Sequence, residues 1–539
     1  MMKYGRLTTF EDVASSSVGQ VLDRSLSLCP EKLALVDGKE RITYRDLNNR
    51  VNRFASGLSS LGIRKGDRFV IDLPNSPELV IAFCALAKLG AITTWCNPMY
   101  REKEVEFILR NSGARGVLPR REFDGYDYVP MIKEASRGIG LEHIITVGGG
   151  GGSATFEEVA TAGSGNPPVP LIDPLKDIVK IIYTSGTTGV PKGAPYTHYQ
   201  AIRSGFIFSA ALDTTADDIL LACLPLYHSY AFFCVLMHCL SIHAAMVLME
   251  KWDAETALKL IQEERVTVHP AAPIHFIMEM NHPRFREHDL SSLRVGLLSG
   301  YIPPPGLLEK IEQEYRFWVS NSWGASEIGS GAIGFPDSPR EKRLHTVGRP
   351  HEKEMLRVVD PETGEEVQRG NMGEIMVKGW NVIHGYWNDP EETTRQFDRN
   401  GWFHSGDLGV MDGDGYLTIL GRVKDQINRG GLKIVPRDVE EELQRYGKIA
   451  EVAVVGTPNP VLGESICACI IPREEETVTL HEIREFLASR ISRNKLPDEM
   501  CLMREFPRLP GGVKLNRYGP GGIRELAVKD SKRETLKKG

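Results

Sequence analysis

Apolar and polar residues alternate along the first part of the chain in blocks that are typical of helices and strands in turn. Leucine, valine and phenylalanine recur at helical spacing in residues 43–61, which predicts an amphipathic helix. A short apolar strand is predicted over residues 68–73, and Pro77 followed by the apolar residues 79–89 predicts the next helix. Strands that alternate with helices in this way are typical of parallel sheets with both faces covered. The pattern therefore predicts an α/β fold.

Two stretches depart from this pattern. Residues 148–170 are rich in Gly, Ser and Pro, which predicts a surface loop without a helix or strand. Residues 219–249 are the most apolar part of the chain, but a proline and three histidines interrupt them. Because a membrane span needs ~20 predominantly apolar residues, we expect a buried core segment here and no membrane span. Within it, His238 and His243 are expected to be core residues whose hydrogen bonds are satisfied.

The pattern changes near residue 421. A hairpin-like segment, residues 411–416, precedes this point. After it the pattern predicts a helix, two strands and a second helix, at residues 438–446, 452–455, 466–471 and 481–491. A chain of 539 residues is too long for one core, since a domain has ~100–200 residues. We predict a large N-terminal domain of several subdomains with parallel-rich sheets (residues 1–421), a small α+β C-terminal domain (425–539), and a hinge at 422–425.

Composition and charge narrow the possible partners and compartments. The formal net charge of −6 gives no electrostatic argument for binding nucleic acid or an anionic membrane. The nine cysteines are scattered and form no C-x-x-C pair, which argues against a disulfide framework or a zinc site. They are expected to be small core residues in a reducing compartment. Since no secretory signal is recognisable at the N-terminus, we expect a cytoplasmic protein.

The strongest chemical signal follows the apolar run 178–182 and reads Y-T-S-G-T-T-G-V-P-K-G over residues 183–193. Glycines let backbone N–H groups approach a ligand closely, and hydroxyls and a lysine add donors, so the segment suits a polyphosphate. It is not a Walker loop, because no Gly-Lys-Ser/Thr ends it. A Ser/Gly-rich surface turn is the less favoured alternative. The residues predicted to bind phosphate are Thr184, Ser185, Gly186, Thr187, Thr188, Gly189 and Lys192.

Two further motifs suit a nucleotide. In residues 321–327, an aromatic ring beside a glycine offers a flat face to a base, and Ser326 and Glu327 can reach a phosphate oxygen and a divalent cation. Taken alone, a core tryptophan before a turn explains Trp323 more often. In residues 401–407, the carboxylate of Asp407 can accept two hydrogen bonds from ribose hydroxyls, although a turn-forming Gly-Asp is an equal alternative.

Together these segments resemble the adenylate-forming superfamily, which includes acyl-CoA synthetases, aryl-acid AMP ligases and amino-acid adenylation domains. Residues 183–193 match its phosphate loop, 321–327 its aromatic-Gly-x-Thr/Ser-Glu motif, 402–407 its W-x-x-T/S-G-D motif, and 421–431 its hinge and glycine-rich loop. The resemblance implies ATP and Mg²⁺ as cofactors, and as thiol either CoA or the phosphopantetheine of a carrier protein. It assigns the hinge to Lys424 and the metal to Glu327. The remaining nucleotide contacts that it implies are Gly300, Asn321, Trp323, Gly324, Ser326, Asp407, Arg422 and Lys433.

Residues 424–434, 462–465 and 124–128 look most like the 2,3-dihydroxybenzoate-AMP ligase-like subgroup. In that group a His-Asn-Tyr run lines the acyl pocket and its Asn reads a ring hydroxyl, whereas this chain has Ser229 at that position and Cys234 where a Ser is usual. A site selects an acid with a ring hydroxyl only when it keeps the polar group that binds that hydroxyl. We therefore expect a benzoate, a cyclohexane-type ring carboxylate or a short acyl chain rather than a catechol acid. The pocket residues implied are Ser229, Tyr230, Cys234, Ser299 and Tyr301, with His228 beside the substrate carboxylate.

The catalytic lysine of the family is displaced in this chain. The family reads Pro-x-Thr-Pro-x-Gly-Lys, whereas Val513 stands here at the lysine position and Lys514 follows it. A one-residue slip of the loop would restore the lysine; otherwise, alternation along a strand would point it to the opposite face. Lys514 is the candidate, with His228 and Glu327 as further catalytic residues.

The resemblance implies an ATP-dependent carboxylic acid–CoA ligase that acts through an acyl-AMP intermediate. One alternative is a stand-alone aryl-acid AMP ligase that loads a carrier protein, of the 2,3-dihydroxybenzoate or salicylate type. A second alternative is a non-catalytic nucleotide-binding protein, which the displaced lysine keeps open.

Overall fold

The computed structural model describes residues 3–184, 191–351, 354–429, 432–509, 515–530 and 532–535. The chain divides into two compact units, the first formed by Met1–Leu356 and Val377–Phe403, the second by Arg357–Met376 and His404–Gly539. We call them the large unit and the small unit. The predicted boundary at residues 422–425 falls within the sequence of the small unit, and the predicted hinge stays a prediction.

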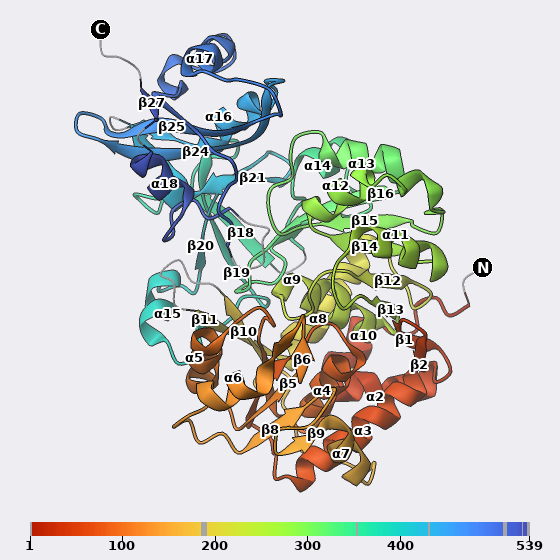
Figure 1. Ribbon diagram of the computed structural model, residues 1–539. Coiled ribbons are helices and arrows are strands. Elements are labelled where there is room, and N and C mark those ends of the chain that lie inside the picture. Colours follow the sequence, from red (N-terminus) through yellow and green to blue (C-terminus); the bar gives the residue numbers. More distant parts are fainter. Residues whose placement is uncertain are drawn as a thin grey trace. The chain divides into compact units, whose positions relative to one another are not determined.

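The large unit is built on two sheets that are mostly parallel (Figure 1). The seven-stranded sheet has the order β11-β10-β4-β3-β5-β8-β9, and only its β10–β11 pair is antiparallel. Its strands are β3 (Arg68–Asp72), β4 (Ile92–Trp95), β5 (Gly116–Pro119), β8 (His143–Thr146), β9 (Ala154–Thr155), β10 (Ile178–Thr184) and β11 (Lys192–Thr197).

The eight-stranded sheet has the order β17-β16-β15-β14-β12-β13-β1-β2, with antiparallel pairs only at its two ends. Its strands are β1 (Leu33–Asp37), β2 (Glu40–Thr43), β12 (Ile219–Ala222), β13 (Ala245–Leu248), β14 (Val268–Ala271), β15 (Val295–Leu298), β16 (Trp318–Trp323) and β17 (Ala332–Ile333). A separate hairpin pairs β6 (Glu122–Phe123) with β7 (Tyr126–Asp127). The predicted α/β class with parallel-rich sheets is confirmed.

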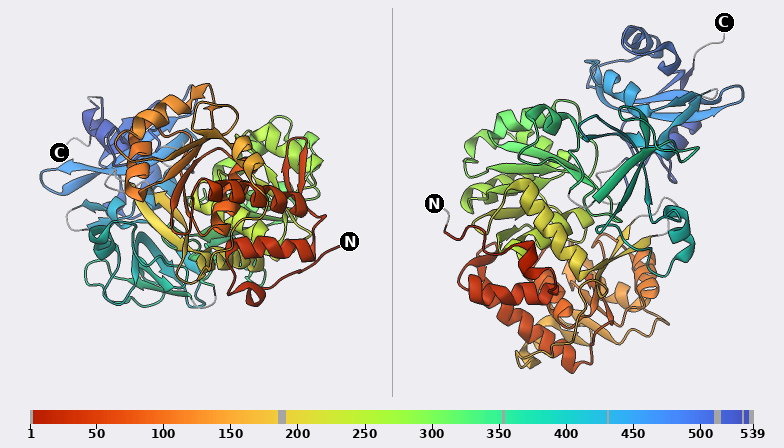
Figure 2. Two further views of the ribbon diagram at one scale, coloured as in Figure 1. Left: turned by 90° about the horizontal axis from the view of Figure 1, so that it is seen from below. Right: turned by 180° about the vertical axis from the view of Figure 1, so that it is seen from behind.

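Helices follow most of these strands and cover the sheets. Figures 1 and 2 show the π-helix η1 and helix α8 between the two sheets, where η1 contacts β12 and α8 contacts β10 and β11. The helices of the unit are α1 (Phe10–Val13), α2 (Val18–Leu28), α3 (Tyr44–Ser60), α4 (Pro77–Lys88), α5 (Glu102–Ser112), α6 (Tyr128–Ala135), α7 (Phe156–Ala162), α8 (His198–Leu212), α9 (Ser229–Ala231), η1 (Phe232–Met237), α10 (His238–Ile242), α11 (Ala254–Glu263), α12 (Pro273–Asn281), η2 (Phe285–Glu287), α13 (Leu307–Tyr315), α14 (Arg340–His345) and α15 (Pro390–Gln396).

The elements predicted from apolar spacing form where local signals support them. Helix α3 begins at Thr43, whose hydroxyl accepts a hydrogen bond from the N–H of Asp46, and its periodic apolar residues are buried. Helix α4 begins at Ser76 with Pro77 in its first turn. These helices and the strand β3 between them confirm the first three predicted elements.

The predicted loop over residues 148–170 was wrong in its middle part. Strand β9 and helix α7 form there, because Thr155 and Glu158 make a capping box at the start of the helix. Phe156 is buried and stacks on Phe54 of α3, with 4.2 Å between the ring centroids. This burial stabilises a helix in a segment whose composition is typical of a loop.

The apolar stretch 219–249 lies in the core of the large unit, as predicted. No helix in the described parts of the chain is long and apolar enough to cross a membrane. His238 is buried and shares a hydrogen bond of 2.6 Å with Thr214, so its prediction is confirmed. His243 is also buried, but neither ring nitrogen has a hydrogen-bond partner among the residues that the structure describes; its ring packs edge-on against Tyr44 instead. The prediction of satisfied hydrogen bonds for His243 was therefore wrong.

The small unit has an α+β organisation. A four-stranded sheet, most of whose residues belong to this unit, has the order β18-β19-β20-β21, and its β20–β21 hairpin confirms the predicted turn at 411–416. A six-stranded sheet with a buried aliphatic core follows, and residues that were predicted as a helix, two strands and a helix form α16, β24, β25 and α17. The elements are β18 (Glu354–Val359), β19 (Met372–Gly379), β20 (Phe403–Met411), β21 (Leu417–Arg422), η3 (Val423–Asp425), β22 (Ile427–Arg429), β23 (Leu432–Ile434), α16 (Pro436–Leu443), β24 (Ile449–Asn459), β25 (Gly463–Pro472), α17 (Leu480–Ala488), η4 (Arg493–Lys495), β26 (Glu499–Leu502), α18 (Ile523–Lys529) and β27 (Glu534–Thr535).

All nine cysteines are buried and free, which confirms that they are core residues.

Candidate functional site

The predicted phosphate loop joins two paired strands. Thr184 at the end of β10 lies directly opposite Lys192 at the start of β11, so the hairpin holds both ends of the loop in register. Ser185, Gly186, Thr187, Thr188 and Gly189 lie outside the described residues. The paired strands therefore place the two ends of the predicted loop at Thr184 and Lys192.

Lys192 is buried and forms an ion pair with the Oε1 atom of Glu392 on α15. Glu392 also accepts hydrogen bonds of 3.2 Å from Arg395 and Gln396. Burial alone would raise the pKa of Glu392, but the hydrogen bond and charge of Lys192 lower it below its usual value. Lys192 thus has an anionic partner within the protein, and its contact with a phosphate stays a prediction.

Glu327 follows β16 and is tied to the segment that precedes α15. The hydroxyl of Tyr386 donates a 2.9 Å hydrogen bond to Glu327 Oε1, and the N–H of Ile383 donates one of 2.9 Å to its backbone oxygen. Burial and the neighbouring carboxylate raise the pKa of Tyr386, so the phenol stays protonated as the donor. The Lys192 Nζ lies 5.6 Å from the centroid of the Tyr386 ring. Two motifs that are far apart in the sequence therefore meet at Tyr386.

Trp323 at the end of β16 is buried, in agreement with the alternative of a core tryptophan. A side chain at Gly331 would lie 2.5 Å from the indole ring, so the backbone there packs against Trp323. Gly324 is equally constrained, because a Cβ atom would lie 1.9 Å from the carbonyl oxygen of Gly329. Asn321 is buried on the same strand and accepts a 3.0 Å hydrogen bond from the N–H of Ser322. Contacts of these residues with a nucleotide stay predictions.

The predicted acyl-pocket residues gather at the carboxyl ends of β15 and β16. The Ser229 and Ser326 hydroxyls share a hydrogen bond of 3.0 Å, and the Tyr230 hydroxyl donates one of 2.9 Å to the Leu297 carbonyl. Ser299, which follows β15, donates one of 3.1 Å to the Ser322 carbonyl. Residues of the predicted acyl pocket and of the aromatic-glycine motif therefore contact each other at this edge of the sheet.

The other predicted residues around this cluster differ in exposure. Cys234 is completely buried in η1, Tyr301 is half-buried and Gly300 is exposed. His228 is exposed and begins α9, its Nδ1 atom accepting a 3.2 Å hydrogen bond from the N–H of Tyr230. This hydrogen bond fixes the start of the helix that carries Ser229 and Tyr230.

The small unit carries the remaining predicted residues. Asp407 and Arg422 lie opposite each other on β20 and β21, with 2.9 Å between Asp407 Oδ1 and Arg422 Nε. Lys424 is exposed in η3, and Lys433 Nζ lies 3.7 Å from Glu362 Oε1. Lys514 lies outside the described residues. The structure thus brings together the predicted ribose ligand and the arginine next to the predicted hinge.

The fit of Mg²⁺ depends on Glu327. The described residues contain no group of three or more His, Cys, Asp or Glu side chains that could hold a metal ion. Mg²⁺ is usually held by one or two carboxylates together with substrate phosphates and water, so a single glutamate beside a nucleotide is compatible with it.

Three residues of this cluster were missed in the sequence. Tyr386 binds Glu327, Glu392 pairs with Lys192, and the Tyr196 hydroxyl donates a 2.8 Å hydrogen bond to the Ser326 carbonyl. A usable signal for the first two was the run Gly385-Tyr386-Trp387-Asn388-Asp389-Pro390, which combines aromatic residues with the start of a helix.

Known proteins match the chain over most of its length. The AMP-binding enzyme family matches residues 22–387, and the AMP-binding enzyme C-terminal domain matches residues 438–512. The human mitochondrial medium-chain acyl-CoA ligase ACSF2 is 30% identical over 549 residues, which cover 96% of this chain and 89% of that protein.

Solved structures agree. MatB from Rhodopseudomonas palustris with bound ATP superposes with a TM-score of 0.86 and 26% identity, covering 95% of this chain and 99% of MatB. The anthranilate CoA ligase AuaEII in complex with anthranoyl-AMP gives a TM-score of 0.85 and 26% identity, covering 95% of this chain and 98% of that one.

The chain therefore belongs to the AMP-binding enzyme family. It is an AMP-forming acid–CoA ligase, which uses ATP to activate a carboxylic acid as an acyl-AMP before transfer to the thiol. The superfamily and the reaction predicted from the sequence are confirmed. The finer resemblance to 2,3-dihydroxybenzoate-AMP ligases finds no support among these relatives, whose names refer to CoA ligases of other acids.

Proposed function

We propose that the protein ligates CoA to a ring carboxylate, aromatic or alicyclic, or to a short acyl carboxylate, in the cytoplasm. The observation that carries this proposal is the hydrogen bond between Ser229 and Ser326. Ser229 stands at the position where the resembling aryl-acid ligases have an Asn whose amide binds a ring hydroxyl. Here the Ser229 hydroxyl bonds to that of Ser326 instead. The buried residues Phe232, Phe233 and Cys234 follow shortly after in the chain. Such a lining favours an apolar guest without an ortho hydroxyl.

In the first half-reaction, the carboxylate of the acid attacks the α-phosphorus of ATP and pyrophosphate leaves. We propose that Thr184, the loop after it and Lys192 bind the phosphates, while His228 lies beside the acid's carboxylate. Lys514 neutralises the charge that develops on the α-phosphate, since catalysis of this step is mostly positioning and charge neutralisation. Mg²⁺, when bound, offsets phosphate charge, with Glu327 as its protein ligand.

Asn321, Trp323, Gly324, Gly300 and Ser326 are proposed to bind the rest of the nucleotide. In the small unit, Asp407 accepts hydrogen bonds from the ribose hydroxyls, with Arg422 and Lys433 as further contacts.

In the second half-reaction, the thiolate attacks the acyl carbon and AMP leaves. Lys424 is proposed to carry the hinge motion between the two steps, because the backbone φ and ψ angles of a residue in a short connecting segment can absorb the rotation.

ATP–pyrophosphate exchange with a panel of acids tests the proposed substrate class. Benzoate, cyclohexanecarboxylate and short-chain acids should support exchange at lower KM than 2,3-dihydroxybenzoate or salicylate. Preference for the two hydroxylated acids would overturn the assignment of the pocket.

The thiol acceptor can be tested in the same reaction. Addition of CoA should convert the acyl-AMP to a thioester, whereas a phosphopantetheinyl carrier protein should do so poorly. Faster transfer to the carrier protein would favour the alternative of a carrier-loading aryl-acid AMP ligase.

A further inference from the structure

Lys180 on β10 is a completely buried lysine whose Nζ atom has no hydrogen-bond partner among the described residues. Its Nζ lies over two aromatic rings, 3.1 Å from the centroid of Trp95 and 3.9 Å from that of Phe232. Burial lowers the pKa of Lys180 well below its usual value. Because a buried amine without a polar partner is costly, the two ring faces are the groups that accommodate it.

The rings around Lys180 form a rigid cluster. Phe232 packs edge-to-face on Phe83 of α4 and on Trp95 of β4, with centroid distances of 5.4 and 5.6 Å. Both phenylalanines are completely buried. Edge-to-face packing fixes ring orientation more tightly than aliphatic packing does, so Lys180 sits at a point where few side chains can move.

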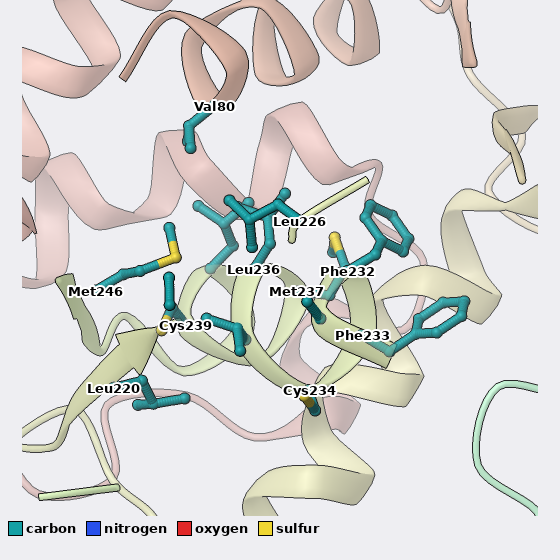
Figure 3. Close-up of a cluster of buried hydrophobic side chains, with 14 of the residues drawn as sticks. Val80, Leu220, Leu226, Phe232, Phe233, Cys234, Leu236, Met237, Cys239 and Met246 are labelled. Carbon is teal, nitrogen blue, oxygen red and sulfur yellow. The ribbon is translucent and has the colours of Figure 1, made fainter. Parts of the chain in front are cut away.

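Phe232 is also the first residue of the π-helix η1, which contains Cys234 of the predicted acyl pocket. Single π-helical turns occur frequently at functional sites. Figure 3 shows the side chains of Phe232 and Cys234, two positions apart on this helix, pointing in opposite directions. A rotation of η1 that released Phe232 would therefore move Cys234 as well.

A second route links Lys180 to the pocket through packed side chains. The rings of Phe232 and Phe233 lie 4.9 Å apart, and those of Phe233 and Tyr196 lie 4.8 Å apart. The Tyr196 hydroxyl binds the Ser326 carbonyl, and Ser326 binds Ser229. Contacts in a close-packed interior transmit displacements because there is little free volume to absorb them.

We propose that Lys180 is a positioning residue that determines acid specificity: by holding Phe232 it fixes η1 and thereby the depth of the acyl pocket. This inference rests on the proposed assignment of that pocket. In this proposal Lys180 acts through Phe232 and makes no contact of its own with the acid or the nucleotide.

The test compares Lys180→Met with Phe232→Leu and with the double variant. Methionine keeps the length of the side chain but removes the amine. Each variant is assayed by ATP–pyrophosphate exchange with ring and chain acids of increasing size. We expect kcat/KM for large acids relative to small ones to rise about tenfold in Lys180→Met, since pocket fit contributes factors of this order. KM for ATP should stay unchanged.

Within one preparation, the ratio of kcat/KM between two acids does not depend on the fraction of active enzyme. A loss of stability alone therefore leaves this ratio unchanged. Phe232→Leu should shift the ratio in the same direction, and the double variant should add nothing to the larger single effect. Lys88→Met is the control, because the Lys88 side chain is largely buried but binds Asp23 and Asn52, on α2 and α3, rather than an aromatic ring of this cluster.

Wild-type acid ratios in both single variants, or additive effects in the double variant, would overturn the proposal. If Lys180→Met does not fold, Phe232→Leu and Lys180→Gln decide the question by the same ratios. Failure of the proposed substrate class has a different signature: wild-type enzyme would then exchange with none of the acids in the panel.

Discussion

The interiors of the two units differ in the groups that they bury. The large unit encloses several histidines, clusters of aromatic rings, and Lys180, for which the described residues supply no hydrogen-bond partner. The core of the small unit between α16, α17 and its sheet is aliphatic, and its two histidines, His404 and His481, are half-buried and exposed. A larger unit buries a larger fraction of its surface, so it can accommodate polar side chains whose burial costs free energy.

This contrast agrees with a division of roles. In the large unit, residues proposed to bind phosphate and metal are held by buried partners, as Lys192 is by Glu392 and Glu327 by Tyr386. In the small unit, the residues proposed to act on the nucleotide are half-buried or exposed, as are Asp407, Arg422 and Lys433. Held residues suit a binding site, whereas accessible ones suit a part that changes its contacts between two half-reactions.

The largest expected effect concerns Lys514 of the small unit. Lys514→Ala should slow acyl-AMP formation by about 10²–10³, the contribution of one positioned charge in a water-poor site. Thioester formation from supplied acyl-AMP should continue. Single-turnover assays of each half-reaction measure this, with the exposed Lys529→Ala as control. Equal losses of rate in acyl-AMP formation and in thioester formation would contradict the proposed division of roles between the two units.

The second prediction concerns the ion pair in the large unit. Lys192→Ala should weaken ATP binding about tenfold, because it removes a charge-assisted contact. It should also lower the free energy of unfolding by about 1–3 kcal/mol, since Glu392 would lose its buried cation and keep only Arg395 and Gln396 as partners. Lys192→Met/Glu392→Gln should recover stability but not ATP affinity. Denaturant unfolding and ATP titration separate the two; unchanged ATP affinity would remove Lys192 from the phosphate site.

The third prediction is that acid destabilises the large unit first. Burial lowers the pKa of His198, His238, His243 and His275 to about 4. Unfolded histidines have a pKa of about 6.5, so between pH 6.5 and 4 the unfolded state binds more protons than the folded state. The free energy of unfolding therefore decreases as the pH is lowered through this range. Each histidine contributes up to about 3 kcal/mol to this loss.

His269 has the opposite dependence. Although burial opposes its charge, Glu279 raises the pKa of His269 to about 10, so its contribution is fully present below pH 6.5 and is lost toward pH 10. Peptide-resolved hydrogen exchange measures this. When the pH is lowered from 7 to 5, the rate of opening should rise more in the large unit than in the small unit. Faster opening of the small unit at pH 5 would contradict the comparison.

The smallest expected effect is on selectivity. Ser229→Asn introduces an amide that can bind a ring hydroxyl, so kcat/KM for salicylate relative to benzoate should rise about tenfold. Ser27→Asn serves as control, because Ser27 is exposed on α2 and its hydroxyl binds the Arg24 carbonyl. An unchanged ratio would place Ser229 outside the acyl pocket.

Elements with strong local signals could be predicted from the sequence. Helix α3, helix α4 and strand β10 have apolar spacing or capping residues that act within a few positions. Helix α7 was missed because its capping residues are surrounded by Gly, Ser and Pro, and its burial against Phe54 comes from a residue about a hundred positions earlier.

The motifs of the site could be located from sequence, but their partners could not. Glu392 pairs with Lys192 across 200 positions, and Tyr386 binds Glu327 across 59. Such pairs have no periodicity, because they arise only when distant elements fold together. The lack of a hydrogen-bond partner for His243 within the described part of the chain was missed for the same reason: its burial was predictable, whereas its partners depend on the surrounding side chains.

The order in which the chain builds the two units has a consequence for cleavage. The chain passes from one unit to the other after Leu356, after Met376 and after Phe403. A single proteolytic cut within residues 377–403 would thus leave each unit composed of segments from both fragments. The nicked protein should migrate as two bands under denaturing conditions yet elute from a sizing column as one species, and separation of the fragments would require that both units unfold.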